Sequence, residues 1–399
     1  MKKTLLTLVA MVAISVVAVA QKNPDLRHLA KITPHRTELI LPQVNGYNIY
    51  KADLHVHTVY SDGTLSGKGR VQEAYYDGLD IIAITDHLEY RPNEGNFLKA
   101  TEGYHKRLPE AHNSRISTKP ADKKGILADL NVSYLDAKKP GQRLGLLVIP
   151  GVEITRHPDS IGHYNALFVK DANKIYSASA EKAIRNAKEQ GAIVMHNHPG
   201  WKRTTTAKNE FHEKVYGAGL IDGVEIVNGG NFGAKLIKRC LDEKLFMAAA
   251  TDIHTPTAHL YSMRGYFRTC TFILAKECTE EAIKEALLED RTLAFSYNNV
   301  MGEEKLVKEL FNASVSMKVI YTSSKGEKTV ALTNMSSIPY SLRRNPKSGI
   351  LTLNPFQTIS VKVAKGKNLG FSVLNMWTAN EKSPNGKHPH ILYKIAEAE

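Results

Sequence analysis

The sequence predicts an α/β protein in which a β/α barrel is followed by a small antiparallel β-sandwich. Between residues 48 and 296, short apolar runs alternate with stretches of helical periodicity, a pattern typical of parallel strands joined by crossover helices. About eight such runs favour a barrel over an open sheet. After about residue 305, strand-like runs follow one another between Gly, Asn, Pro and Ser turns, which indicates antiparallel strands.

The composition is that of a folded chain. Of its 399 residues, 42% are hydrophobic and 23% charged, which allows one large catalytic domain and a smaller one and excludes collagenous, low-complexity and wholly disordered proteins. Cys240, Cys270 and Cys278 have no CxxC spacing. They therefore indicate neither a thiolate metal site nor a disulfide framework. One disulfide bridge is possible, and unpaired structural thiols are the equal alternative.

Residues 1–20 have the pattern of a secretory signal peptide. Lys2 and Lys3 precede an apolar run over residues 4–20 that ends in Ala18-Val19-Ala20, and a small-x-small site of this kind is a cleavage signal. An uncleaved anchor is the alternative, but a spanning helix needs about 20 apolar residues. We expect an exported protein, periplasmic or secreted, with no membrane span after signal cleavage.

The chain is basic. Its formal charge of +13 falls to +11 when Lys2 and Lys3 are removed, and a basic surface attracts acidic substrates as well as anionic polymers. Much of the excess follows residue 305, where Lys and Arg are interleaved with strand-like residues. That arrangement favours a solvated face, so we expect no stable nucleic-acid complex. The oligomeric state stays open.

The elements follow in order after a lead-in over residues 21–47. The barrel is expected over residues 48–305, with strands at 49–54, 79–85, 144–154, 163–169, 192–195, 223–227, 246–251 and 271–275, and helices at 179–190, 234–245 and 279–288. Residues 88–143 interrupt this rhythm with a polar insertion rich in Lys, Arg, Asn and Pro. A segment of this length is a lid candidate, and mere decoration is the equal alternative.

The sandwich is expected over residues 306–399. Its strands are predicted at 315–321, 328–333, 349–353, 358–363 and 370–373, and no helical pattern of useful length is evident there. We expect this part to pack on the barrel and to shape one side of the active-site cleft.

Residues of the metal-ligand type gather where the predicted barrel strands end. One polar residue after an apolar strand is unremarkable, but six strands share the pattern, and the carboxyl ends of barrel strands meet at one mouth. Burying so many imidazoles and carboxylates without cations would be costly. The residues are His55 and His57, Asp62, Asp86 and His87, Glu153, His163, His196 and His198, and Asp252 and His254.

A set of imidazoles and carboxylates without thiolate suits Zn²⁺, Mn²⁺ or iron and does not decide between them. Such ions lower the pKa of a bound water to about 7 and hold phosphoryl oxygens during displacement. The sequence therefore predicts a metal-dependent hydrolase.

These motifs resemble the polymerase and histidinol phosphatase (PHP) superfamily. They are His55-x-His57 with Ser61-Asp62-Gly63, Thr85-Asp86-His87, Gly151-x-Glu153, His198-Pro199 and Asp252-x-His254, in the family's order over about residues 50–300. The resemblance implies a distorted (β/α)7 barrel with three divalent metals. The signal sequence, the stretch from Glu153 to Leu167 and the C-terminal β region resemble an exported phosphodiesterase branch.

The resemblance also implies how the ligands are divided. A first metal takes His55, His57, Glu153 and Asp252, a second takes the bridging Glu153 with His163 and His198, and a third takes Asp62, His87 and His254. His198 is favoured over His196 because the family's ligand precedes Pro. His163 competes with His157, which also follows Glu153.

Further roles are less sharply indicated. Asp86, next to His87, is the catalytic candidate, either orienting that ligand or moving a proton. Arg156, Trp201 and Lys202 follow ligand motifs and are candidates for substrate binding at the rim, although each could be an ordinary surface residue.

The sequence thus predicts an exported metal-dependent phosphoesterase that favours phosphodiesters and acts through a metal-activated hydroxide. A phosphomonoesterase of the same superfamily is the nearest alternative. An amidohydrolase-type deacylase or lactonase also begins with His-x-His but uses a carboxylated Lys as bridge, where this chain has Glu153. A non-enzymatic surface binding protein is the alternative from another class.

Overall fold

The computed structural model describes residues 35–93, 129–345 and 347–379, all but His35 within one compact unit, Arg36–Glu399. The expected signal peptide and most of the lead-in lie outside the described residues. No helix of the described part is long and apolar enough to cross a membrane.

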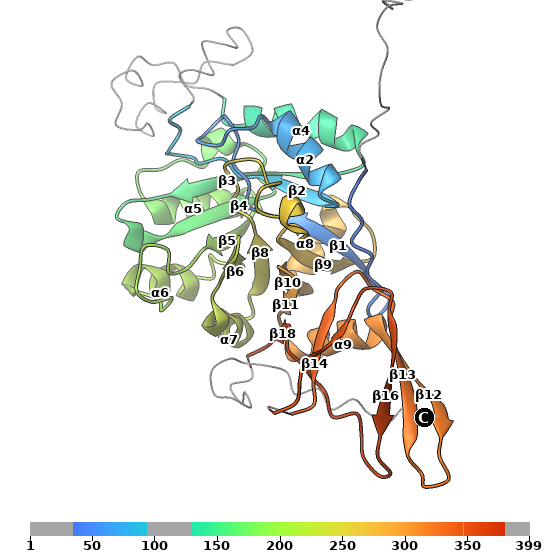
Figure 1. Ribbon diagram of the computed structural model, residues 1–399. Coiled ribbons are helices and arrows are strands. Elements are labelled where there is room, and N and C mark those ends of the chain that lie inside the picture. The colour runs from blue at the N-terminus through green and yellow to red at the C-terminus, as the bar shows by residue number, and fades with distance from the viewer. Residues whose placement is uncertain (1–34, 94–128, 346, 380–399) are drawn as a thin grey trace, which may run out of the picture. The chain divides into compact units, whose positions relative to one another are not determined.

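The centre of the molecule is a twelve-stranded curled sheet (Figure 1). Along the sheet the order is β18-β11-β10-β9-β1-β2-β3-β4-β5-β6-β7, and β8 also pairs with β6. Thr271 of β9 bonds through its hydroxyl to both the N–H and the C=O of Ala249 in β8, so the sheet curls back toward its start. The strands are β1 (Asn48–Asp53), β2 (Ile81–Ile84), β3 (Leu147–Thr155), β4 (His163–Leu167), β5 (Ile193–Asn197), β6 (Gly223–Asn228), β7 (Asn231–Phe232), β8 (Phe246–Ala250), β9 (Cys270–Ala275), β10 (Thr292–Ser296), β11 (Asn299–Met301) and β18 (Met376–Trp377).

The barrel prediction is confirmed, but not all of its strands are parallel. β1, β2 and β3 are parallel, as are β5, β6 and β8. β4 is antiparallel to both of its neighbours, and β9 is antiparallel to β1. The link from β3 to β4 holds only the short 3₁₀ turn Asp159–Ile161. Without a crossover helix the chain must return antiparallel, which distorts the barrel.

The helices of the barrel are α2 (Gly67–Tyr76), α4 (Val132–Arg143), α5 (Ala180–Glu189), α6 (Glu210–Gly217), α7 (Ala234–Glu243) and α8 (Glu280–Leu288). The three expected helices are present as α5, α7 and α8, and two have capped starts: Ser179 accepts from the N–H of Lys182 in α5, and Thr279 accepts from that of Ala282 in α8. In α5 the residues Ala183, Ile184 and Ala187 are buried, at the spacing of one helix face.

The prediction of an insertion over residues 88–143 is wrong for its last part. Residues 132–143 form α4, which packs on α2 and β3 and is the crossover helix between β2 and β3. Pro140 inside the helix and its polar composition hid the helical pattern. Residues 94–128, the rest of the lid candidate, lie outside the described residues.

The C-terminal part is a small antiparallel β-sandwich, as predicted. β12 (Val315–Thr322), β13 (Lys328–Asn334) and β16 (Thr358–Val363) form one sheet, and β15 (Leu351–Leu353), β14 (Tyr340–Arg343) and β17 (Ser372–Val373) form the other. Both contribute to a core shared with the barrel side, including Leu332, Val361, Leu342 and Phe311. We expected no helix after about residue 305, and this expectation is wrong for the first residues of the C-terminal part. There α9 spans Glu304–Ser314, and its buried face of Val307, Leu310 and Phe311 packs in the core of the sandwich.

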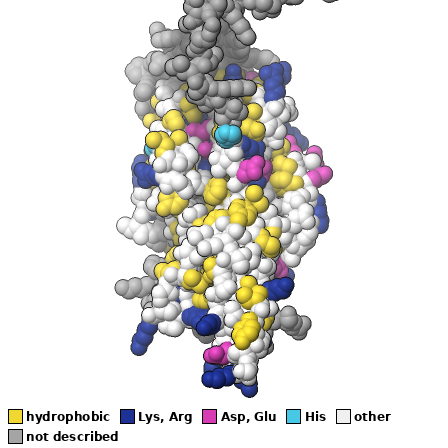
Figure 2. Space-filling view, turned by 45° about the vertical axis from the view of Figure 1, so that its right-hand side comes forward, with side chains coloured by type: hydrophobic (Ala, Val, Ile, Leu, Met, Phe, Trp, Pro, Cys, Tyr) yellow, Lys and Arg dark blue, Asp and Glu magenta, His cyan; other side chains and the backbone are white. Residues whose placement is uncertain are grey.

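After the sandwich, the chain returns to the barrel. β18 pairs in parallel with β11, so residues near position 376 become part of the large sheet. On the face drawn in Figure 2, basic and acidic side chains lie scattered among hydrophobic side chains and uncharged surface and form no single basic patch.

Candidate metal centre

The first ligand-type residues are placed by a tight approach of two chain segments. His55 and His57 follow β1, and Val56 between them pairs with Ile253 after β8. Gly63 closes the next turn, where a Cβ atom would lie 2.6 Å from the carbonyl oxygen of His57. Only glycine fits this approach, which folds Asp62 back over the histidines.

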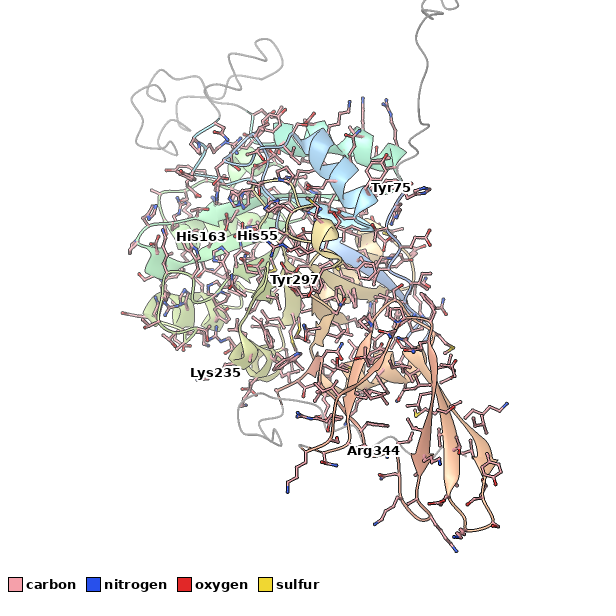
Figure 3. All side chains as sticks on the ribbon, in the orientation of Figure 1. His55, Tyr75, His163, Lys235, Tyr297 and Arg344 are labelled. Carbon is pink, nitrogen blue, oxygen red and sulfur yellow. The ribbon has the colours of Figure 1, made fainter. Side chains whose placement is uncertain are left out.

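Nine of the predicted residues converge at this end of the barrel (Figure 3 labels His55 and His163). Their side-chain nitrogens and oxygens form four overlapping groups, within each of which the atoms lie within 4.8 Å of one another. The groups are His57, Asp62, His87 and His254; His55, His57 and Glu153; His55, His198 and Asp252; and Glu153, His163 and His198.

Glu153 is the centre of the cluster. Its Oε1 lies 3.2 Å from Nδ1 of His163, 3.5 Å from Nε2 of His55 and 3.6 Å from Nε2 of His198. Its Oε2 lies 2.5 Å from Nδ1 of His87. Oε2 also lies 3.6 Å from Nε2 of His57. Each oxygen thus faces one histidine of the His55 and His57 pair together with histidines from other segments, an arrangement that a bridging carboxylate can have.

Asp252 and His198 adopt unusual backbone conformations. Their φ angles are +53° and +30°, a region that costs non-glycine residues about 1–3 kcal/mol and is concentrated at functional sites. The conformation brings Oδ1 of Asp252 to 3.2 Å from Nε2 of His55 and 3.0 Å from Nε2 of His57.

Asp62 holds the third group together. Its Oδ2 lies 3.2 Å from Nε2 of His254 and 3.4 Å from Nε2 of His87. His57 contributes to this group as well as to the first, because its Nδ1 lies 3.7 Å from Oδ1 of Asp62 while its Nε2 faces Asp252. The resemblance had given His57 to the first metal alone.

The electrostatics favour ionised carboxylates. Burial raises the pKa of Glu153, but the neighbouring His87, His55 and His163 outweigh it and hold that pKa well below its usual range. The pKa values of Asp62 and Asp252 are also lowered, since hydrogen bonds and charges from histidines outweigh burial. Burial and the charge of His87 lower the pKa of His57 to about 4. Around His55, His87, His198 and His254 the neighbouring carboxylates outweigh burial and raise the pKa of each imidazole. The site is therefore a compact set of anions among imidazoles.

These residues fit divalent metal ions. All donors are imidazole nitrogens or carboxylate oxygens, as Zn²⁺, Mn²⁺ and iron accept. His163 keeps a buried Nε2 without a hydrogen-bond partner, although buried imidazole nitrogens normally have one. The arrangement can polarise a bound ester and stabilise an anionic oxygen.

Glu225 is a site residue that the sequence analysis missed. Its Oε1 lies 3.2 Å from Nδ1 of His55, and its Oε2 accepts from the N–H of His198 at 2.7 Å. Asn228 donates to both Glu225 and Asp252. A lone carboxylate in the apolar run 223–227 was the signal that could have found Glu225, since a buried charge needs a partner.

Two buried arginines tie the ligand-bearing segments together. Arg70 of α2 donates to the carbonyl oxygens of His57, Ile253 and Thr255. Arg268 forms an ion pair of 2.7 Å with Asp53 at the end of β1. Both side chains are fully buried, so Arg268 has a structural ion pair and does not reach a substrate.

The hydrogen bonds of Asp86 correct its expected role. Its carboxylate accepts from the N–H and hydroxyl of Thr58 and from the hydroxyl of Ser61, and it is not bonded to the ring of His87. Nδ1 of His87 lies instead 2.7 Å from Oγ1 of Thr155. Asp86 therefore braces the turn after His57 and does not orient the ring of His87.

Of the three substrate candidates, Trp201 lies over the cluster. Its ring centroid is 5.0 Å from that of His163 and 5.5 Å from that of His198. Lys202 lies next to it, with its ammonium 4.1 Å from the centroid of the indole and 3.4 Å from Asp159. Both side chains are exposed and can reach a bound molecule.

Arg156 is occupied elsewhere. Its guanidinium pairs with Glu89 at 2.8 Å, donates to the carbonyl of Ser177 and lies over the ring of Tyr176. This side chain is largely buried by those contacts, which does not suit the expected role in substrate binding.

The two competing histidines lie outside the cluster. The side chain of His157 is 82% exposed and pairs with Asp159. His196 points to the hydroxyl of Tyr216, 2.8 Å from its Nδ1, and stacks on Tyr164. The structure thus brings His163 and His198 into the cluster, and neither alternative.

Comparison with known proteins gives the same picture. Residues 53–222 match the family model of the PHP domain. The chain is similar to a two-domain protein from Bacteroides vulgatus that contains a predicted PHP-like metal-dependent phosphoesterase, with 30% identity and a TM-score of 0.75 over 91% of this chain and 100% of the other.

More distant structures match only in part. An amidohydrolase from Chromobacterium violaceum has 15% identity and a TM-score of 0.34, covering 51% of this chain and 88% of its own. A lesion-specific endonuclease Q from Pyrococcus furiosus has 16% identity and a TM-score of 0.39, covering 64% and 60%. Neither similarity carries an argument about function. No curated protein matches the sequence.

Proposed function

Because the chain belongs to the PHP family of metal-dependent phosphoesterases, we propose that it hydrolyses phosphodiesters at the cluster around Glu153. The observation that carries the proposal is the position of this carboxylate. Its Oε1 faces His163, His198 and His55, and its Oε2 faces His57 and His87, so this carboxylate contacts imidazoles of every group. Divalent ions held there would lower the pKa of water to about 7 and neutralise charge on phosphoryl oxygens.

The side chains of the protein set the geometry of the reaction. We assign His55, His57, Glu153 and Asp252 to one ion, Glu153, His163 and His198 to a second, and Asp62, His87 and His254 to a third, with His57 near enough to serve the last as well. Glu225 orients the ring of His55, and Asn197 donates to Oε1 of Glu153 at 2.9 Å. Such partners restrict each ligand to one rotamer and one tautomer.

Substrate contacts come from the rim. Trp201 covers His163 and His198, so its indole excludes water from that side of the cluster. Lys202 brings a cation to the same place, where a phosphodiester carries its negative charge. These two residues, and not Arg156, are the proposed contacts.

The phosphodiester preference and the export are both parts of this proposal. The first rests on the resemblance to an exported branch, and the second on the pattern of residues 1–20. Glu153 stands where the deacylase or lactonase alternative would have a carboxylated lysine, and its two oxygens face histidines from several segments of the chain, which disfavours that alternative.

The test is hydrolysis by the purified chain without residues 1–20. Bis(p-nitrophenyl) phosphate, p-nitrophenyl phosphate, a p-nitrophenyl acyl ester and a lactone are compared with Zn²⁺ or Mn²⁺ and with a chelator. Chelator-sensitive cleavage that is fastest for the diester supports the proposal. Faster cleavage of the monoester would indicate a phosphomonoesterase and contradict the diester preference. Inactivity toward every phosphate ester would overturn the proposed function.

A further inference from the structure

A cavity of about 500 Å³ lies directly beside the metal cluster. On one side it is lined by His198 and Glu225, and by Asn228, which donates to Asp252. A ligand in this cavity would therefore lie against the residues assigned to the reaction. Its size exceeds what the phosphoryl group alone needs, so it has room for an organic part of the substrate.

The remaining walls combine two aromatic rings with neutral polar groups. Trp201, with 44% of its surface exposed, and Phe232 of β7 supply the rings. Thr204, Thr205 and Thr206 supply hydroxyls. Exposed aromatic faces of this kind stack on flat aryl rings and on the C–H faces of saturated rings, while hydroxyls bond to polar edges. Lys235, at the start of α7 (Figure 3), and Arg203 add positive charges.

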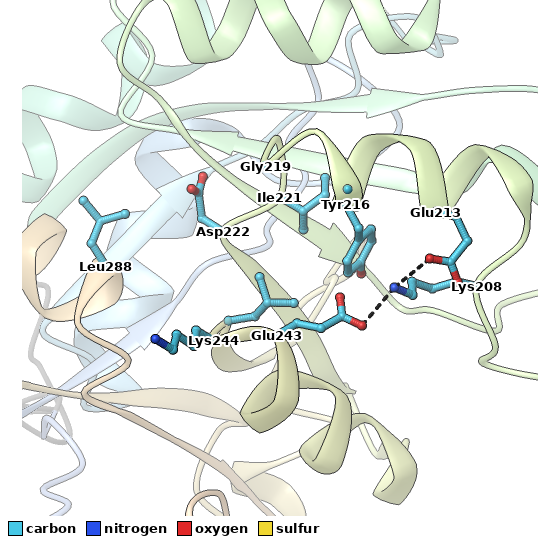
Figure 4. Close-up of a pocket in the computed structure, with 11 residues that line it drawn as sticks. Lys208, Glu213, Tyr216, Gly219, Ile221, Asp222, Glu243, Lys244 and Leu288 are labelled. Atoms are coloured by element: carbon cyan, nitrogen blue, oxygen red, sulfur yellow. Dashed lines mark ion pairs between the residues drawn. The ribbon is translucent and has the colours of Figure 1, made fainter.

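A second cavity, of about 460 Å³, differs from the first in its position and in its charges (Figure 4). It is lined by Asp222 and Leu245, which precede β6 and β8, so it lies at the opposite ends of the strands from the cluster. Lys208 there pairs with both Glu213 and Glu243. The charge of Lys208 is thus matched, and none of the lining residues belongs to the metal-ligand groups.

One wall of the first cavity packs against the C-terminal end of the described chain. The ring of Phe232 packs edge to face on Trp377 of β18, with 5.6 Å between centroids. Trp377 is fixed in turn by a hydrogen bond of 3.0 Å from its indole N–H to Asn299 and by the pairing of β18 with β11. The segment after the sandwich thus supports one wall of the cavity.

We propose that this cavity binds a ring-bearing alcohol group of the phosphoester, with Phe232 as a specificity-determining residue that Trp377 holds in place. This inference rests on the proposed function, since it assigns the organic part of the substrate to the same site. It also gives the segment after the sandwich a role in substrate recognition, because Trp377 in that segment packs on Phe232 and holds its ring in place.

The test uses phosphonates, which carry one organic group and are not hydrolysed. Binding of methyl-, cyclohexyl- and phenylphosphonate to the Mn²⁺-loaded protein is measured by calorimetry. We expect either ring to bind about tenfold more tightly than methyl. A benefit limited to phenylphosphonate would define an aryl group, and a benefit for both rings would include saturated rings such as sugars.

Variants test whether the preference for a ring depends on Phe232 and Trp377. Phe232→Ala and Trp377→Ala should bring the ratio of ring to methyl affinity close to one and leave methylphosphonate binding unchanged, whereas Trp377→Phe should retain most of the ratio. Phe356→Ala, which removes a ring 58% exposed in the sandwich, is the matched control. Should Trp377→Ala fail to fold, Phe232→Ala carries the test.

The outcomes separate the two proposals. Ring and methyl phosphonates of equal affinity, or a ratio that survives Phe232→Ala, would overturn the assignment of this cavity even if the protein cleaves phosphodiesters. A ring preference that depends on Phe232 in a protein inactive on every ester would keep the cavity and overturn the proposed function.

Discussion

Nδ1 of His55 lies 3.2 Å from Oε1 of Glu225, and the other oxygen of this glutamate accepts from the backbone N–H of His198. One buried carboxylate thus contacts the ring of one proposed ligand and the backbone of another, and the two are assigned to different ions. Replacing it changes the site without removing a proposed ligand.

We expect Glu225→Gln to weaken metal binding or activity about 10- to 100-fold, the usual effect of losing the partner of a metal-binding histidine. The cause is the loss of the charged acceptor that fixes the tautomer of His55. Competition with a chelating dye measures the affinity. Glu285→Gln, at a side chain 64% exposed, is the control, and equal affinities in both variants would contradict this role.

The buried guanidinium of Arg70 connects the segment after β1 with the segment after β8. Arg70→Leu would leave the carbonyl oxygens of His57, Ile253 and Thr255 without this donor. It would also remove the closer of the two arginines that pair with Glu73. We expect the free energy of unfolding to fall by about 3–5 kcal/mol, measured by urea denaturation of the metal-free protein. A loss below about 1 kcal/mol would show that the two segments hold together without Arg70.

His212 should make stability depend on pH. Burial, and then the charge of Arg203, lowers the pKa of this imidazole to about 4, below its ordinary value of about 6.5. Between these values the unfolded chain binds the proton and the folded chain does not, so stability is complete above pH 6.5 and is lost as the pH falls toward 4. The loss amounts to about 3 kcal/mol at most.

The matching variant is His212→Gln. His212 is the third residue of α6, where it completes a capping box with Asn209, and glutamine suits that position. Between pH 7 and pH 4.5 the variant should lose less stability than the unaltered protein by up to about 3 kcal/mol. Parallel pH profiles of the two unfolding free energies would contradict the assignment.

Much of the fold and the cluster could be predicted because local patterns determine them. His55-x-His57 and Asp252-x-His254 follow apolar runs, and residues two apart share a face of an extended chain. The carboxyl ends of the strands then bring distant residues such as Glu153 and His198 together. Their assignment to particular metal ions is a proposal, but their proximity follows from the barrel.

Other features depend on contacts that sequence patterns do not show. The direction of β4 depends on a link without a helix, and α4 contains Pro140. Asp86 was expected beside His87 because the two are adjacent in sequence, yet its carboxylate bonds to Thr58 and Ser61. Arg156 was expected at the rim, but Glu89 holds it. In each case a tertiary partner decides the role of the residue.

The most direct test of the central claim is the metal content of the purified protein and its activity on bis(p-nitrophenyl) phosphate, compared between the unaltered chain and Glu153→Ala. Asp136→Ala is the control, since that carboxylate belongs to none of the four groups. We predict nearly three divalent ions per chain with chelator-sensitive cleavage, and fewer ions with at least a hundredfold loss of activity in Glu153→Ala. Full activity and unchanged metal content in Glu153→Ala would contradict the claim that this carboxylate organises the site.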